Sequence, residues 1–209
     1  MELREVIETR ASVRQFAGDM VPVEHLREMV RLAGLAPSIN NSQPWRFIAM
    51  TNRELLASLA GAVRGKVEEM LPVCNDEEER RAKSQVEWFS TFFEDAPAVI
   101  AVVACPYQAI VDKALPHTNL SHDDLNAMRG HPDIESIGAS IQNLMLAAVN
   151  MGYGTCWLSG PLIAREALEE RLRIEQPWRL AAMIAVGKPA HTTRQREKKP
   201  VEEIFELIN

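Results

Sequence analysis

Residues 36–47 read Ala36-Pro37-Ser38-Ile39-Asn40-Asn41-Ser42-Gln43-Pro44-Trp45-Arg46-Phe47. Two prolines, two asparagines and two serines exclude a helix interior, and Pro44 disfavours the α conformation at Gln43. The segment is therefore expected to be an extended or turning loop, and the apolar run 47–50 that follows it is expected to be a strand. Such a loop is either a capped turn between a helix and a strand, or a rigid polar rim for a flat heteroaromatic ligand.

Outward from this loop, the length of 209 residues predicts one domain, 1–209, with a substantial core. The charged beginning of the chain predicts that there is no signal peptide, and the best apolar run, 98–105, is far shorter than the roughly 20 residues that span a bilayer. Cys74, Cys105 and Cys156 are widely spaced, which predicts neither a disulfide framework nor a zinc site and favours a reducing cytoplasm. The net charge of −6 argues against a general nucleic-acid binder.

Hydrophobic periodicity divides the chain into helices and strands. Helices are expected at 2–9, from Pro22 to Ala33, from Asn52 through Leu59, from the acidic stretch 76–80 onward, at 134–151 and at 162–172. Gly61 and Gly65 should weaken the far end of the helix that Asn52 caps. Strands are expected at 47–50, 98–104, 155–158 and 180–186. The mixture lacks a strict βαβα rhythm, so an α+β fold is predicted.

The segment 106–133 loses periodicity and gathers His117, His122 and His131. A structureless insertion of this length is often a functional lid, and a mobile flap over a pocket is the favoured interpretation. The histidines lack the tight helical spacing of metal ligands, so no metal site is predicted, and a metal-dependent hydrolase stays only as a rival.

Four aromatic residues, Trp88, Phe89, Phe92 and Phe93, recur at helical spacing. This pattern is more typical of a core or a dimer interface than of a substrate pocket. Trp88 and Phe92 nevertheless remain candidates for shaping such a pocket.

Cationic residues gather near both ends of the chain. In an extended segment alternate side chains share a face, so Arg10, Ser12 and Arg14 are expected to point the same way. Two guanidinium groups beside a hydroxyl suit a phosphate, and Arg196 and Lys198 repeat the spacing in the tail. The alternative is ordinary solvation at the surface. Neither a G-x-G-x-x-G nor a G-x-x-x-x-G-K-[ST] motif offers another phosphate site.

Five blocks of sequence, in order along nearly the whole chain, resemble the nitroreductase family of FMN-dependent oxidoreductases. The blocks are Thr9-Arg10-Ala11-Ser12-Val13-Arg14-Gln15-Phe16, Ala36 to Trp45, Gly138-Ala139-Ser140-Ile141-Gln142-Asn143-Leu144, Gly152-Tyr153-Gly154-Thr155-Cys156-Trp157 and Gly187-Lys188-Pro189. The resemblance implies an α+β fold with a central, mostly antiparallel sheet surrounded by helices. It also implies an intertwined homodimer, with FMN at the subunit interface and a C-terminal arm, 190–209, exchanged between subunits.

The resemblance also assigns the cofactor-binding residues. Arg10, Ser12 and Arg14 would hold the phosphate and ribityl chain, and Arg196 and Lys198 would close on the phosphate. The isoalloxazine would be bordered, from the other subunit, by Pro37, Ser38, Ile39 and Asn41, with Gln43 supporting that loop. The turn whose backbone N–H reaches flavin N5 would be Leu158, Ser159 and Gly160. Arg14 is the first candidate for a cation near flavin N1 and O2, and Arg64 and Lys66 are further candidates.

The implied activity is that of an FMN-dependent NAD(P)H oxidoreductase of the cytoplasm. NADH or NADPH would deliver a hydride to flavin N5, and a nitroaromatic, a quinone or a similar small oxidant would then accept the electrons by ping-pong kinetics. The flavin carries the chemistry, so no catalytic side chain is predicted. The alternatives are a dehalogenase, an enzyme that consumes flavin to make the lower ligand of cobalamin, and a protein that only binds or stores FMN. The sequence leaves open the oxidant and the choice between NADH and NADPH.

Overall fold

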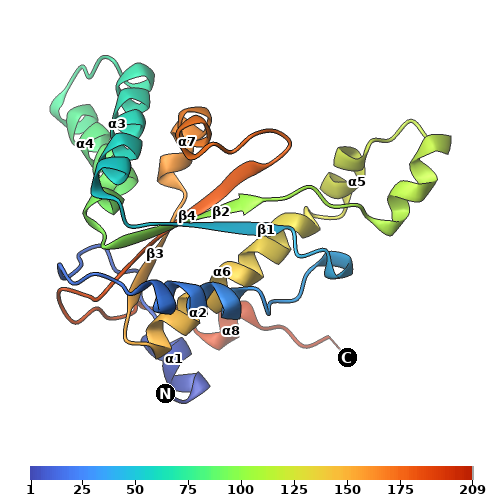
Figure 1. Ribbon diagram of the computed structural model, residues 1–209, viewed down its shortest axis with the longest axis horizontal. Helices are drawn as coiled ribbons and strands as arrows, with labels where there is room; N and C mark the ends of the chain where they lie inside the picture. Colours follow the sequence, from blue (N-terminus) through green and yellow to red (C-terminus); the bar gives the residue numbers. More distant parts are fainter. Residues whose placement is uncertain (209) are drawn as a thin grey trace.

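A four-stranded sheet divides the helices of the computed structural model, which describes residues 1–208, into two layers (Figure 1). The strand order is β1-β2-β4-β3, and every neighbouring pair is antiparallel. This arrangement confirms the predicted α+β fold with an antiparallel sheet. The elements are α1 (Leu3–Thr9), α2 (Val23–Ala33), η1 (Ile39–Asn41), β1 (Trp45–Met50), α3 (Arg53–Met70), α4 (Glu77–Thr91), η2 (Phe92–Asp95), β2 (Ala98–Ala104), η3 (Ile110–His117), α5 (His122–Met128), α6 (Pro132–Asn150), β3 (Gly154–Leu158), η4 (Gly160–Ala164), α7 (Arg165–Leu172), β4 (Arg179–Gly187) and α8 (Val201–Ile204).

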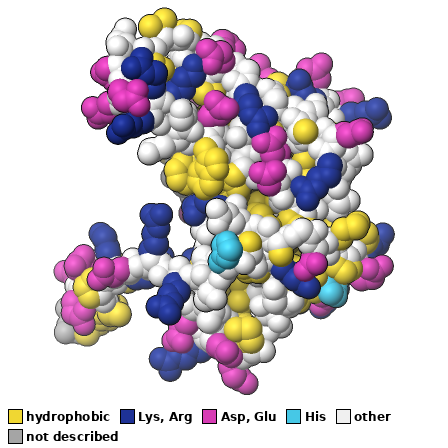
Figure 2. Space-filling view, turned by 90° about the vertical axis from the view of Figure 1, so that its left-hand side faces the viewer, with side chains coloured by type: hydrophobic (Ala, Val, Ile, Leu, Met, Phe, Trp, Pro, Cys, Tyr) yellow, Lys and Arg dark blue, Asp and Glu magenta, His cyan; other side chains and the backbone are white. Residues whose placement is uncertain are grey.

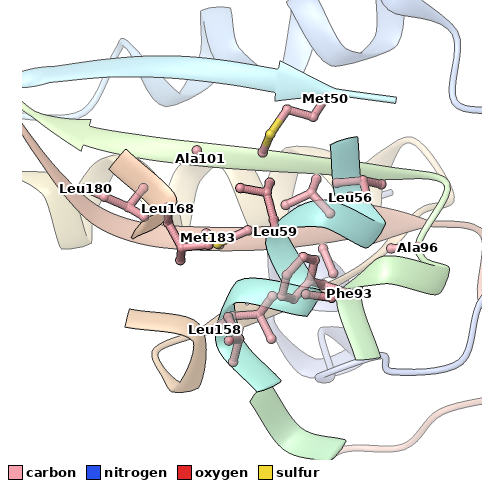
Figure 3. Close-up of a cluster of buried hydrophobic side chains, with 14 of the residues drawn as sticks. Met50, Leu56, Leu59, Phe93, Ala96, Ala101, Leu158, Leu168, Leu180 and Met183 are labelled. Carbon is pink, nitrogen blue, oxygen red and sulfur yellow. The ribbon is translucent and has the colours of Figure 1, made fainter. Parts of the chain in front are cut away.

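Both faces of the sheet are buried because side chains alternate along each strand. On one face, Val99, Ala101 and Met183 pack beneath α3, η2 and α7, in the cluster drawn in Figure 3. On the other face, Ile100 and Ile184 pack against α2 and α6. The central strand β2 is buried on both faces, which explains why it appears in the sequence as a continuous apolar run.

Local sequence signals place several helix ends. The side chain of Asn52 accepts the Leu55 N–H at 2.9 Å, as expected of an N-cap, and Asp76 does the same for Glu79 at 2.8 Å. The expected weakening at Gly61 and Gly65 does not occur, because α3 continues through both glycines to Met70. Its buried face, which packs on the sheet, overrides their low helix propensity.

The segment between β2 and α6 extends from one end of the sheet (Figure 1). The expectation that it is structureless is wrong, because it contains η3 and α5. The Ser121 side chain caps α5 by accepting the Asp124 N–H, while Asp124 accepts the Ser121 N–H in return. Within residues 1–208, no helix is long and apolar enough to cross a bilayer.

Candidate functional site

The segment after α1 lies along the edge of the sheet beside β3. Ser12 forms a parallel bridge with Thr155, and the Val13 N–H donates to the Thr155 carbonyl at 2.9 Å. Ala11 and Val13 are only 8% and 4% exposed, whereas Arg10, Ser12 and Arg14 are more exposed. The alternation expected from the sequence is therefore present, and it keeps the two guanidinium groups and the hydroxyl out of the core.

All three side chains act on the buried Cys156 thiol of β3. Burial raises the pKa of the thiol, while the Arg14 charge, the Ser12 hydroxyl and the Arg10 charge each act to lower it. All three groups are therefore close enough to one atom of β3 to influence it. Neither arginine forms an ion pair with any residue in 1–208, so their charges remain available to an anion.

The C-terminal end of α4 connects this segment with the turn after β3. The Arg14 guanidinium carbon lies 5.5 Å from the centre of the Phe89 ring. The next residue, Ser90, packs so tightly against Gly160 that a Cβ on this glycine would lie 2.6 Å from the Ser90 Oγ. The end of α4 therefore brings two predicted groups into one region of the fold: Arg10, Ser12 and Arg14, and Leu158, Ser159 and Gly160. The sequence did not reveal Phe89 and Ser90 as the residues that join them.

The loop 36–44 is held by interactions that its sequence only partly indicates. Asn40, Asn41 and Gln43 have φ values of 50°, 53° and 48°, a left-handed conformation that asparagine tolerates better than most residues. The Gln43 N–H donates to the Ser38 Oγ at 3.0 Å. The Ile39 N–H donates to the Ser136 Oγ of α6, also at 3.0 Å, and this anchor could not be foreseen because Ser136 lies 97 residues away.

The loop and the arginine segment lie at opposite ends of the sheet (Figure 1). Trp45 follows the loop and pairs with Ala104, whereas Ser12 bridges to Thr155, which pairs with Val186 at the Ala98 end. The seven residues of β2 span roughly 20 Å at about 3.3 Å each. A single chain therefore does not bring Pro37, Ser38, Ile39, Asn41 and Gln43 next to Arg10, Ser12 and Arg14.

The basic tail runs beside α1. The Gln195 Nε2 donates to the Ile7 carbonyl at 2.7 Å, three residues before Arg10, while Arg196 and Lys198 are exposed. Figure 2 shows one face of the molecule, on which an apolar patch borders a hollow. The C-terminal segment projects from the body beside this hollow, with Lys and Arg side chains along it.

The other sequence candidates have different surroundings. Arg64 is engaged by Glu94 and Glu87, and Lys66 pairs with Glu69 at 2.8 Å, so both charges are already compensated. Phe92 is buried in the core and lies beneath Trp88, which is 47% exposed. Among residues 1–208, no group of three or more His, Cys, Asp and Glu is arranged to hold a metal ion.

Comparison with known proteins places this geometry in context. The family model described as the Nitroreductase family matches residues 7–188. The 5,6-dimethylbenzimidazole synthase of Rhodospirillum rubrum is 27% identical over 95% of this chain and 84% of its own length. A BluB-like flavoprotein from Clostridium difficile superimposes with a TM-score of 0.89 at 31% identity, with all of both chains covered. A nitroreductase from Desulfitobacterium hafniense, solved with bound FMN, gives a TM-score of 0.73 at 20% identity over 100% of this chain and 99% of its own.

Proposed function

The chain belongs to the nitroreductase family, and on this premise we propose that it is a homodimeric FMN-dependent oxidoreductase that takes electrons from NADH or NADPH. The observation that carries the proposal is the shared face of Arg10, Ser12 and Arg14 beside β3, with both arginines free of carboxylate partners within residues 1–208. An oxidoreductase of the reducing cytoplasm also accords with the three free cysteines.

The residues present fit the phosphate end of FMN. Two guanidinium groups and a hydroxyl supply charge-assisted hydrogen bonds to a dianion, each worth roughly 1.5–3 kcal/mol. The Thr155 Oγ1, on the strand residue that Ser12 bridges, is buried and has no hydrogen-bond partner, and such an orphaned polar atom calls for an explanation such as a nearby ligand. Arg196 and Lys198 would add charge from the tail, which already lies against α1.

The ring end of FMN requires a second copy of the chain. We assign the loop with Pro37, Ser38, Ile39, Asn41 and Gln43 to the flavin held by the partner's arginines, because the two halves lie at opposite ends of one sheet. The C-terminal arm supports this assignment. Its apolar side chains are exposed by 63% at Val201, 68% at Ile204, 64% at Phe205, 69% at Leu207 and 86% at Ile208, and a partner subunit would bury them.

Each group of residues has a separate task in the proposed reaction. Bound FMN would accept a hydride from NAD(P)H and pass electrons to a small oxidant such as a nitroaromatic or a quinone. Arg10, Ser12 and Arg14 would fix the phosphate, and Arg14 would add positive charge for the anionic reduced form. Leu158, Ser159 and Gly160 would present backbone at the close approach that Gly160 permits. The exposed rings of Trp88 and Phe89 would limit the access of water.

A second candidate function is the consumption of FMN itself, and the relationship to a 5,6-dimethylbenzimidazole synthase favours it. Reductive dehalogenation is a further family alternative. The three chemistries leave different products. A reductase regenerates its flavin at every turnover, a synthase destroys one flavin per product, and a dehalogenase releases halide.

The deciding experiment is an anaerobic titration of the purified protein with NADH and with NADPH, followed by visible absorbance. We expect a yellow protein whose flavin is bleached by at least one of the two and is restored by menadione or a nitroaromatic without loss of FMN. Stoichiometric loss of FMN in air would instead identify the flavin-consuming function. A yellow protein that neither nucleotide reduces would be a storage protein.

A variant pair tests the role of the loop. Ser136→Ala leaves the Ile39 N–H without its partner, which destabilises the observed conformation of the loop by about 1–3 kcal/mol. The matched control is Ser140→Ala, whose hydroxyl bonds only to the Ile137 carbonyl within α6. We expect weaker FMN binding in the first variant and wild-type binding in the second. Equal FMN affinities of the two variants, measured by flavin fluorescence, would show that this loop does not contribute to FMN binding.

A further inference from the structure

A cleft lies at the end of the sheet where β2 ends and β4 begins. It encloses about 720 Å³, which is within the range of about 300–1,000 Å³ typical of small-molecule sites. Its walls come from the ends of the two strands, from the 106–131 segment and from the beginnings of α6 and α7. It lies next to the loop 36–44, because the Cys105 N–H donates to the Pro44 carbonyl at 3.0 Å and both Ala104 and Cys105 line it.

Two arginines give one wall of this cleft its charge. Arg165 opens α7 and Arg179 opens β4, and both lie between this cavity and a neighbouring one against α3 and line the two. Neither forms an ion pair with any residue in 1–208. Arg165 is half-buried and Arg179 is exposed, so both can present N–H donors to a ligand. Two guanidinium groups without carboxylate partners give this wall the chemistry to bind an anion with several oxygens.

The opposite wall carries a fixed polar network. The Tyr107 hydroxyl donates to the Asn126 Oδ1 at 2.6 Å, and the Asn126 Nδ2 donates to the Asp133 Oδ1 at 2.8 Å. The second carboxylate oxygen of Asp133 is left to accept further hydrogen bonds, and the exposed Asp123 also lines this side. Carboxylates here would repel a phosphate but suit the hydroxyl groups of a ribose. The arginine wall therefore matches an anionic group, and the opposite wall matches the hydroxyl groups of a sugar in the same ligand.

We propose that this cleft binds the adenosine diphosphate half of the NAD(P)H that reduces the partner's flavin. Arg165 and Arg179 hold the diphosphate, and Asp133 accepts hydrogen bonds from ribose hydroxyls. This inference rests on the proposed function, because the adjoining loop 36–44 is the part of this chain assigned to that flavin. The volume of the cleft suits a ligand as large as adenosine diphosphate, since a small nitroaromatic would leave most of it empty.

The cleft is tested without turnover by titrating ADP-ribose into the FMN-loaded protein by calorimetry. ADP-ribose carries the proposed half of the nucleotide and has no nicotinamide to exchange a hydride. Arg165→Ala and Arg179→Ala should each weaken its binding by roughly tenfold or more, the loss expected for one charge-assisted contact. Arg171→Ala, on the same helix but outside the cleft, is the matched control and should bind like wild type.

Kinetics supply the second measurement. The arginine variants should raise the KM for the nucleotide by a similar factor, while dithionite-reduced flavin is reoxidised by menadione at the wild-type rate. Arg179→Ala changes an exposed residue, so it keeps the test decisive if Arg165→Ala does not fold. ADP-ribose that fails to bind, or that binds both variants as tightly as wild type, overturns the inference. An FMN-loaded protein that neither nucleotide reduces counts against the proposed function instead, and the titration still tests the cleft.

Discussion

Replacing Arg10 and Arg14 together by alanine is the sharpest test of the phosphate site. Each guanidinium is expected to contribute roughly 1.5–3 kcal/mol to binding a dianion, so the pair contributes about 3–6 kcal/mol if the two effects add. This corresponds to a loss of roughly 10²–10⁴ in FMN affinity. Because both arginines act on one group, their effects are coupled rather than additive, and we expect a loss in the lower half of this range.

The same double substitution should leave the fold intact. Neither side chain is paired with a carboxylate within residues 1–208, and the segment is held by the Val13 N–H bond to the Thr155 carbonyl and by the bridge between Ser12 and Thr155. The main interaction lost is the contact of Arg14 with the Phe89 ring, which is worth about 0.5–1 kcal/mol at an exposed position. Urea unfolding of the two cofactor-free proteins should therefore differ by about 1 kcal/mol or less.

The assay is the ratio of flavin to protein after gel filtration, followed by fluorescence titration of the stripped protein with FMN. The matched control is Arg4→Ala with Arg31→Ala, which removes the same two charges from exposed pairs with Glu8 and Glu28. We expect a largely colourless first variant and a yellow control. Stoichiometric FMN in a folded Arg10/Arg14 variant would show that the phosphate lies elsewhere.

Two further predictions concern packing and pH. Gly160→Ala should lower the free energy of unfolding in urea by about 1–3 kcal/mol, because the new Cβ would lie 2.6 Å from the Ser90 Oγ. In the control, Gly61→Ala, the new Cβ meets open space, so the change should be neutral or stabilising. Equal stabilities of the two variants would contradict the close packing at Gly160. Burial raises the pKa of the Cys105 thiol from 9.0 to about 11, so in a Cys74→Ser protein its alkylation by iodoacetamide should rise with a midpoint near pH 11. Because this thiol ionises at lower pH in the unfolded chain, the folded state should lose stability as the pH rises from about 9 to 11. An alkylation midpoint near pH 9, measured by mass spectrometry, would show that the thiol is not buried.

Much of the fold could be predicted because its signals are local. Asn52 and Asp76 cap helices where their side chains suggest, and the run 98–104 is a strand whose continuous apolar character follows from burial on both faces. The predictions failed where tertiary packing decides. Gly61 lies inside α3 because the opposite face of that helix is buried, and the 106–131 segment contains helices too short to produce a clear periodic signal.

The candidate site divides in the same way. Alternation alone predicted that Arg10, Ser12 and Arg14 share a face, and the buried Ala11 and Val13 between them confirm it. Their role towards FMN stays a prediction. No sequence pattern could show that Ser136 anchors Ile39, because the two residues are 97 positions apart and only the fold brings them together. The same holds for Arg165 and Arg179, which only the fold brings to one cleft.

The four aromatic residues near the end of α4 show how one pattern can serve two purposes. Phe92 and Phe93 are 6% and 0% exposed because they follow the end of α4 and turn into the core, whereas Trp88 and Phe89 are each 47% exposed. Leaving two large rings in water costs stability, so another surface should cover them. Since Phe89 already lies beside Arg14, a ligand that is both flat and anionic would satisfy the rings and the charge together. In the proposed dimer, a second copy of the chain would complete the enclosure, and binding of FMN and dimerisation would then strengthen each other.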